Sequence, residues 1–447
     1  METPNKGDSR WGSLFKNDLQ GMLLPILLIT IIGSVNIFSA TYISSIYENT
    51  GLLGYFLKHM TFLLLSMAVG VILYRYDYRQ LQKPHMLQRI MIVTLIGMIL
   101  VLVIGAVING ARRWIVIGPV SIQPSEFAKL AALIWTAAKL STMRKWGKPR
   151  HINPLINLQG YFSERISYML PMLIWPTIFA GLTILQPDMG TTVLIFGFSF
   201  VLIYLAGFDG KFFGGAFAIA GFLGFIAARM SPYRWERIQS WFDPWPHAQD
   251  MGYQTVQGLL AVGSGGILGE GCMQGTSKYF YLPEAHTDFA FAVWAQEMGF
   301  IGAVFVVVLI AAFTYFGFRI SNKARDEFGK WLAMGITLLI SGQALFNIAM
   351  VCGIMPVTGV PLPFVSYGGS SLLMNFMAIG LLASIGRRNV EGVKPVGTAE
   401  PLPSLREETQ SRFKPAAPKR TNKTNMPGPF KPQPSKKSTR RQTKFER

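Results

Sequence analysis

The sequence predicts an all-α integral membrane protein with about ten transmembrane helices. Half of the 447 residues are hydrophobic, only 15% are charged, and the mean hydropathy is +0.34. A soluble domain carries roughly 25% charged residues. Apolar runs of about 20 residues recur along the chain, and this is the length that crosses a hydrocarbon core of about 30 Å as a helix. These observations exclude an ordinary soluble domain.

The apolar runs predict ten spans, which together form a membrane domain over residues 22–386. In chain order they are 22–42, 56–75, 87–107, 125–141, 166–186, 190–207, 212–230, 288–317, 331–352 and 369–386. The first run is too long for a signal peptide and lacks a small-residue cleavage site, so we expect a retained anchor. A tight turn alone separates the fifth and sixth, and the large connection 231–287 separates the seventh and eighth.

The distribution of cations predicts the orientation of these spans. An even number of spans leaves both termini on one side, where the connections contain Arg79, Lys83, Arg144, Lys145, Lys148, Arg150, Arg319, Lys323, Arg325 and Lys330. Residues 43–55 and 353–368 contain no Lys or Arg. We therefore expect residues 1–21 and the C-terminus in the cytoplasm and the connection 231–287 outside. The cations that depart from this rule are Arg112, Arg113, Arg234, Arg237 and Lys278, and binding of an anionic ligand would explain them.

Residues 387–447 form a predicted disordered, basic cytoplasmic tail, because they are rich in Pro, Lys, Arg, Ser and Thr. Sixteen basic and five acidic residues give this tail +11 of the net charge of +19. Two interpretations remain open: an arm for acidic lipids or a protein partner, and a solvated tail that reinforces topology. No folded basic face with interleaved aromatics accompanies the charge, which argues against nucleic acid. Cys272 and Cys352 lack metal-ligand spacing and are expected to be inert, with a disulfide left open.

Residues 108–129 combine a predicted helix start with outward cations. Pro124 and Ser125 are typical of a first helical turn, and Glu126 suits the positive end of the helix dipole. Ser125, Glu126 and Lys129 share one helix face by their spacing. For Glu126 two interpretations stay open, a local ion pair and a part of a polar site. The cations gathered here are Arg112, Arg113 and Lys129.

Three further segments carry polar groups at the outer ends of predicted spans. Asp188 either caps the sixth span or serves a site, and the two roles are compatible. Pro283–Phe289 holds two carboxylates and an imidazole at the entry of an apolar helix, where ionisable groups usually mark a site. Met355–Ser371 contains too many prolines and glycines for a membrane helix, so it is buried by protein or lines a wet cavity. Together these segments predict one polar cavity that opens outward.

Five blocks resemble the signature blocks of one protein family, the SEDS family of FtsW, RodA and SpoVE. The blocks are Gly110–Trp114, Gln123–Glu126, Gln186–Thr191, Leu282–Phe289 and Val365–Ser371. They occur in the family's order within residues 20–390, so the resemblance is specific. Three segments look more like FtsW and SpoVE: Ser231–Arg234, Phe242–Trp245 and Glu284–His286. Val360–Pro363 and Gly263–Gly266 are also similar to RodA, and on balance the FtsW side is favoured. The tail lies outside the resemblance.

The resemblance implies an enzyme of the bacterial cytoplasmic membrane. Members are peptidoglycan glycosyltransferases that polymerise lipid II outside the membrane, for cell division or for elongation and cell shape. They pair with a class B penicillin-binding protein transpeptidase and use a divalent cation, Mg or Mn. The residue that polymerisation requires in the family matches Asp288 of this chain.

On this basis Asp288 is the predicted general base for the acceptor hydroxyl. The predicted substrate-binding residues are Arg112, Arg113, Gln123, Ser125, Glu126, Lys129, Asp188, Glu284, His286 and Ser366. The cations among them would stabilise the diphosphate, and Glu126 and Asp188 would orient those cations or a metal, whose ligands the sequence does not identify.

Several of these roles have alternatives. His286 either tunes Asp288 or packs at the helix entry, and Ser366 either lines the pocket or belongs to a structural break. Glu284 would point away from Asp288 if the helix began that early. Glu297 either faces the cavity or pairs with a neighbouring helix.

Two other functional classes compete with the enzyme. A flippase for lipid-linked precursors would also need many spans, but alternating access predicts polar sites at the bilayer midplane and a repeat between halves. The ionisable groups here gather at one face instead. A scaffold for a partner synthase would need neither Asp288 nor the outward cations.

Overall fold

The structure, a computed structural model, describes residues 17–47, 53–108, 110–118, 120–143, 158–230, 232–279 and 281–391. Within this part the long helices are α1 (Asp18–Tyr47), α2 (Gly54–Arg75), α3 (Pro84–Ile104), α4 (Pro124–Met143), α5 (Leu158–Leu185), α6 (Met189–Leu205), α7 (Gly210–Arg229), α10 (Ala290–Asn322), α11 (Glu327–Val351) and α12 (Gly369–Glu391). Each of the ten predicted spans coincides with one of these helices. The connection between α7 and α10 contains α8 (Pro232–Phe242) and α9 (Tyr253–Ser264), and the short 3-10 helices are η2 (Tyr78–Gln82) and η4 (Trp245–His247).

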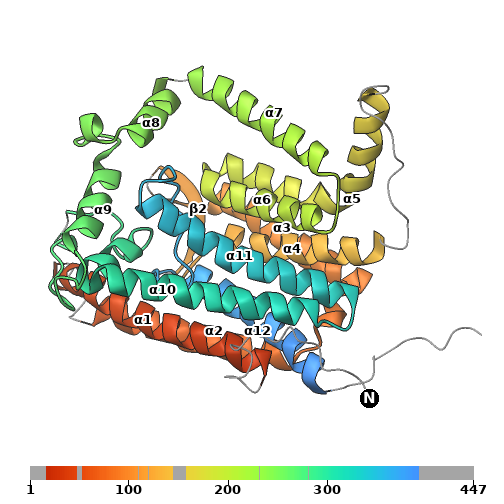
Figure 1. The fold of residues 1–447 in the computed structure, drawn as a ribbon, viewed down its shortest axis with the longest axis horizontal. Coiled ribbons are helices and arrows are strands. Elements are labelled where there is room, and N and C mark those ends of the chain that lie inside the picture. Colours follow the sequence, from red (N-terminus) through yellow and green to blue (C-terminus); the bar gives the residue numbers. More distant parts are fainter. Residues whose placement is uncertain are drawn as a thin grey trace, which may run out of the picture. The chain divides into compact units, whose positions relative to one another are not determined.

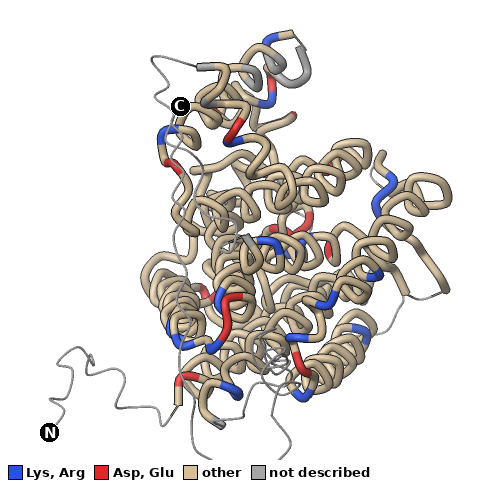
Figure 2. The backbone as a smooth tube through the Cα atoms, turned by 90° about the vertical axis from the view of Figure 1, so that its right-hand side faces the viewer, with Lys and Arg blue, Asp and Glu red and all other residues tan. Residues whose placement is uncertain are grey.

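Seven helices of the described part are long and apolar enough to cross a membrane: α1, α2, α3, α5, α10, α11 and α12. The apolar helix α6 is shorter. Large apolar side chains remain exposed on the outer helices, such as Leu64 at 65% and Val93 at 69%, which suits contact with lipid. Charged residues occupy short, separated stretches of a tube that is otherwise uncharged (Figure 2). The chain is therefore a multi-pass membrane protein.

Helix α11 occupies the interior of the bundle, where it packs against α4, α6, α10 and α12. Helix α10 lies between α1 and α11, and α12 packs against α2 (Figure 1). The loop between α11 and α12 docks closely onto two helices at glycines. A Cβ on Gly190 of α6 would lie 2.6 Å from the Thr358 carbonyl oxygen, and one on Gly33 of α1 would collide with the Phe364 carbonyl. These close approaches bring α1, α6 and the 353–368 loop together.

A small antiparallel sheet between α3 and α4 corrects the all-α prediction. Its strands are β1 (Ala106–Ile108), β2 (Ala111–Ile117) and β3 (Val120–Ile122), in the order β1-β2-β3. Helix α3 ends earlier than the predicted limit of 107, because Gly105 adopts extended backbone with ψ 142. Strand β1 continues the apolar run of α3, and β1 and β3 have three residues each, too few to show a strand alternation in the sequence.

The opposite end of the bundle holds a set of ion pairs between helix ends. Asp18 at the start of α1 pairs with Arg319 at 3.0 Å and with Lys323 at 2.7 Å. Helix α12 continues to Glu391, so the predicted tail boundary at 387 is wrong. The rest of that predicted tail, 392–447, lies outside the described residues. Cys272 and Cys352 are both free.

Candidate active site

Asp288 lies in a turn directly before α10, and two hydrogen bonds fix the backbone of this turn. The amide nitrogen of Phe289 donates to the Glu284 carbonyl at 3.2 Å, and the Asn347 side chain of α11 donates to the Asp288 carbonyl at 2.8 Å. Asn347 also donates to the Val360 carbonyl at 2.7 Å. One amide side chain therefore ties the Asp288 turn to the 353–368 loop.

The Asp288 carboxylate is partly buried and lies among charged groups from distant parts of the chain. Burial, and to a lesser extent the negative charges of Glu284 and Asp188, raise its pKa to about 7 against the opposing charge of Arg113. A carboxylate with this pKa is about half ionised at neutral pH, which suits a general base. The helix starts after Asp288, so the helical phase expected to turn Glu284 away does not apply.

Asp188 caps α6, as one of its two predicted roles requires. Its carboxylate accepts from the Thr191 backbone nitrogen at 3.0 Å and from the Thr191 hydroxyl at 2.8 Å. Gln123, directly before α4, donates to the same carboxylate at 3.4 Å. The cap thus fixes the direction of a charge that acts on Asp288.

Arg113 and Arg112 point to different surroundings, since neighbouring residues of a strand face opposite sides. Arg113 donates to the Gln186 carbonyl at 3.2 Å and also to the Pro187 carbonyl. Arg112 instead donates to the carbonyls of Leu102 and Val103 at 3.3 and 3.5 Å. The structure brings Arg113 to the Asp288 site and leaves Arg112 at the end of α3.

Lys129 and Glu126 form a buried ion pair at 2.8 Å, with side chains exposed by only 1% and 3%. Lys129 also donates to the Gln343 side chain at 2.8 Å, and Gln343 donates to the Pro361 carbonyl at 2.9 Å. The ammonium is committed to protein partners rather than gathered with Arg113. Ser125 is also buried, and its hydroxyl and the second Glu126 oxygen have no hydrogen-bond partner within the described residues. Substrate contact by these residues stays a prediction.

The 353–368 loop joins the remaining predicted residues. The Ser366 hydroxyl accepts from the Leu362 nitrogen at 2.8 Å, a bond inside the loop itself. The Tyr367 nitrogen donates to the His286 carbonyl at 2.8 Å, and the His286 ring lies against Tyr55 and Tyr367 with centroids 6.0 and 5.7 Å apart. His286 therefore has the packing surroundings of one of its two predicted roles.

Two polar residues of α11 were missed by sequence reasoning. Gln343 and Asn347 are four apart in an apolar span and are both buried, and each holds a carbonyl of the 353–368 loop. The signal was available, because amide side chains at a spacing of four on one helix face need partners inside a bundle.

A family model described as a cell cycle protein, the group of FtsW, RodA and SpoVE, matches residues 20–391. The chain belongs to the FtsW/RodA/SpoVE family. This confirms the resemblance of the five sequence blocks.

Two relatives indicate the FtsW and SpoVE side of the family. Stage V sporulation protein E of Bacillus subtilis is 34% identical and aligns over 83% of this chain and 97% of its own. The probable peptidoglycan glycosyltransferase FtsW of the same organism is 32% identical, over 81% and 89%.

Two solved structures share the fold. One comes from work on the structural coordination of polymerization and crosslinking by a peptidoglycan synthase complex. It has a TM-score of 0.65 and 27% identity, and the match covers 83% of this chain and 98% of that chain. The rod shape determining protein RodA of Thermus thermophilus has a TM-score of 0.57 and 26% identity, over 85% and 99%.

Proposed function

We propose that this chain is a peptidoglycan glycosyltransferase that polymerises lipid II on the outer face of the bacterial cytoplasmic membrane. The single observation that carries the proposal is that Asp188 and Arg113, from two distant segments, lie close enough to Asp288 to act on its charge. Family membership and relatives named as glycosyltransferases support the same activity. The FtsW and SpoVE relatives favour a role in division or sporulation over one in elongation.

Asp288 would act as the general base. In glycosyl transfer the acceptor hydroxyl loses its proton to the Asp288 carboxylate, its oxygen forms a bond to the anomeric carbon of the donor sugar, and the bond from that carbon to the diphosphate oxygen breaks. The diphosphate leaves with its lipid. A base whose pKa lies near the working pH is well matched to this proton transfer.

Arg113 would stabilise the departing diphosphate. Two of its five N–H donors hold the carbonyls of residues 186 and 187, and this anchoring aims the remaining donors. Charge-assisted hydrogen bonds to phosphate are among the stronger ones. Preorganised donors of this kind act where charge develops in the transition state.

A divalent cation fits this site only when it is shared with the substrate. No group of three His, Cys, Asp or Glu side chains in the described part of the chain could hold a metal ion. Mg²⁺ is commonly bound through one or two carboxylates plus phosphates, and Asp188 and Glu284 are the carboxylates available beside Asp288. When bound, such a cation would neutralise diphosphate charge.

An apolar groove of about 590 Å³ would hold the lipid tail of the substrate. Side chains of α2, α3, α4 and α12 line it, and its lining includes Ile122 and Pro124. These two residues flank Gln123, which contacts Asp188. A lipid lying in the groove would therefore bring its headgroup next to the charged site.

The membrane topology follows from the same proposal. The ten long helices would be ten spans with both termini in the cytoplasm, and the Asp288 end would face outward. The ion pairs of Asp18 lie at the other end of α10, in keeping with the cation-rich side. A class B penicillin-binding protein is the expected partner, since the synthase complex that this fold resembles couples polymerization with crosslinking.

The test is whether purified protein in detergent makes glycan strands from lipid II and a divalent cation, without another polymerase. Detergent micelles have no two sides, so a flippase would give no product in this assay, and neither would a scaffold. We expect strands longer than the disaccharide, made by the chain alone or with its transpeptidase partner inactivated by a β-lactam. No strands under either condition would contradict the proposed function.

A further inference from the structure

Helix α10 is broken near its outer end, and a loop segment fills the break. Gly299 has φ 68 and ψ −168 inside the helix, a backbone conformation that only glycine adopts readily. The break releases carbonyls from the helical pattern, and the amide nitrogens of Glu270 and Gly271 donate to the carbonyls of Gln296 and Glu297 at 3.0 Å each. The loop thus satisfies backbone groups that α10 leaves open.

The broken helix is paired with this loop in both directions. The Phe300 nitrogen donates to the Gly266 carbonyl at 2.9 Å, and the Ile301 nitrogen donates to the Ile267 carbonyl at 3.3 Å. A Cβ on Gly299 would collide with the Gly269 nitrogen, so the two backbones are in direct contact. The segment 265–279 and the outer half of α10 therefore form one packed unit.

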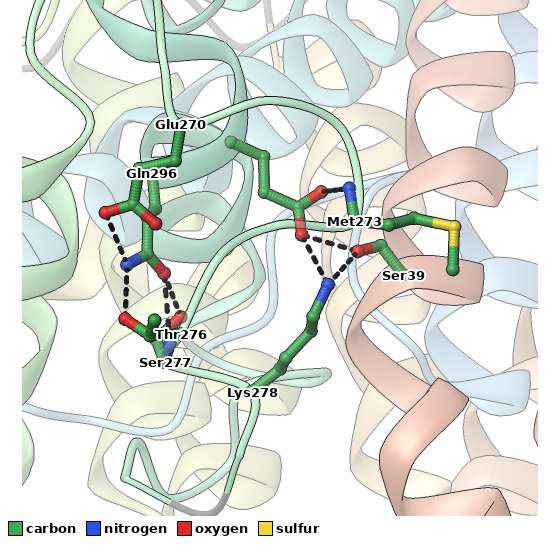
Figure 3. Close-up of polar contacts among 8 residues, drawn as sticks. Ser39, Glu270, Met273, Thr276, Ser277, Lys278 and Gln296 are labelled. Carbon is green, nitrogen blue, oxygen red and sulfur yellow. Dashed lines mark hydrogen bonds and ion pairs between the residues drawn. The ribbon is translucent and has the colours of Figure 1, made fainter.

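A buried ion pair inside this unit is joined to α1 through the Ser39 hydroxyl (Figure 3). The Lys278 ammonium and the Glu297 carboxylate are 2.9 Å apart, and each side chain is exposed by only 2%. Glu297 also accepts from the Ser39 hydroxyl of α1 at 2.6 Å and from the Met273 nitrogen at 3.0 Å. Lys278 donates to Ser39 as well, at 3.1 Å. Lys278, one of the outward cations, is thus explained by an internal partner.

Neighbouring polar contacts hold the same segment. The side-chain oxygen of Gln296 accepts from the Ser277 nitrogen at 3.1 Å, and its amide nitrogen donates to Glu270 and Thr276 at 3.1 Å each (Figure 3). A Cβ on Gly275 would lie 2.9 Å from the Gln296 oxygen, so the loop fits closely over the helix. Gln296 and Glu297 both face the loop.

The outer half of α10 carries Asp288 at its start and Glu297 near its break. Every residue from Ala290 to Glu297 is buried. At the Asp288 end, the Asn36 side chain of α1 donates to the Ala290 carbonyl at 2.8 Å. At the other end, Ser39 of the same helix holds Glu297. Helix α1 therefore contacts this half-helix at both ends. Removing the contact at the Glu297 end would let the half-helix tilt.

We propose that Glu297, Lys278 and Ser39 form a clamp that positions Asp288 for glycosyl transfer, by locking the outer half of α10 and the 265–279 loop to α1. The clamp residues are positioning residues, because they act through the half-helix and do not border the Asp288 carboxylate. This inference rests on the proposed function. A misplacement of about 1 Å in a reacting group costs about 10² in rate, so a buried anchor within the same half-helix is well placed to govern the rate.

The test compares Glu297→Gln with the wild-type chain in glycan polymerisation over a range of pH. Glutamine cannot accept from Lys278, Ser39 and Met273 as the carboxylate does, so the clamp loosens. We expect kcat to fall about 10²-fold with little change in KM. We also expect the acid limb of the pH profile to move to lower pH, since water that enters beside Asp288 relieves its desolvation. Hydrogen exchange in 265–279 should become faster.

Asp18→Asn is the matched control. It removes an ion pair between the same two helices, α1 and α10, beyond the Gly299 break, and should leave the pH profile unchanged. Ser39→Ala leaves both charges paired and is the milder variant if Glu297→Gln does not fold; it should shift the acid limb in the same direction by less.

A wild-type pH profile and kcat in folded Ser39→Ala and Glu297→Gln would overturn the clamp, even with faster exchange in the loop. Absence of glycan from the wild-type chain would instead reject the proposed function, so the two failures are distinguishable.

Discussion

The rate of glycan polymerisation should depend on pH through Asp288. Burial and the charges of Glu284 and Asp188 bring the pKa of this carboxyl to about 7. A general base must be ionised, so activity is lost as pH falls through this value. With a pKa of about 7, about one tenth of the enzyme is ionised at pH 6 and about nine tenths at pH 8, which predicts a roughly tenfold rise in rate.

Glu284→Gln tests the cause of this pKa. Glu284 is exposed and accepts from the Thr287 hydroxyl at 2.7 Å, a bond that an amide oxygen also accepts. Removing its negative charge should lower the pKa of Asp288 and move the acid limb to lower pH. The assay is the initial rate of strand formation at saturating lipid II from pH 5.5 to 8.5, with the folded fraction measured at each pH. A flat wild-type profile between pH 6 and 8, or a Glu284→Gln limb at higher pH, would refute the reasoning.

Three other substitutions have definite outcomes. Arg113→Gln removes the cation that opposes the raised pKa of Asp288, so the acid limb of the pH profile should move to higher pH. The kcat should fall by about 10² to 10³, as for loss of one transition-state donor. A kcat near that of wild type would exclude the diphosphate role. Asp188→Asn should retain most of the α6 cap, because Asn caps as well as Asp, yet shift the acid limb to lower pH; a lower thermal midpoint with an unmoved limb would speak against an electrostatic role. Lys129→Met leaves Glu126 buried without its cation and should destabilise the fold by about 3–5 kcal/mol, measured by thermal unfolding in detergent, with most of the loss recovered when Glu126→Gln is added.

The helices were predictable because lipid imposes a simple pattern on the sequence. Each span needs a long apolar run, and all ten runs coincide with helices of the structure. Helices α8 and α9 escaped prediction because they are short and only partly apolar. The 106–122 sheet was not predicted because β1 and β3 have only three residues each, and β2 carries adjacent cations, Arg112 and Arg113, instead of a clear alternation of polar and apolar residues.

The site was predictable in part. Asp288, Asp188 and Arg113 lie in segments at the outer ends of predicted spans, so their shared side of the membrane predicted that they would lie in one site. Arg112 was predicted to lie in the site but lies at the end of α3. Its strand directs neighbouring side chains to opposite faces, and this segment was not predicted to be a strand. Lys129 was predicted to gather with the arginines, but it pairs inside the bundle with Glu126, one helical turn away.

The contacts that hold the site depend on tertiary packing and were not predictable. The spacing of Gln343 and Asn347 indicates that both need partners, but only the structure identifies the Asp288 carbonyl as one of them. Ser39 occupies an ordinary position in an apolar span, and its importance follows only from its contact with the Glu297 carboxylate. Glu297 had two open interpretations from the sequence, a cavity residue and an ion-pair partner. The structure supports pairing, although its cation comes from the 265–279 loop.

The most direct measurement is the initial rate of strand formation by purified Asp288→Asn at pH 8, beside wild-type protein. Asparagine has nearly the same shape, and the backbone bond from Asn347 does not involve the side chain, so folding and lipid II binding should persist. Loss of a general base predicts a rate at least about 10² lower. A rate within a few-fold of the wild type, from a folded protein that binds substrate, would contradict the assignment of Asp288 as the base.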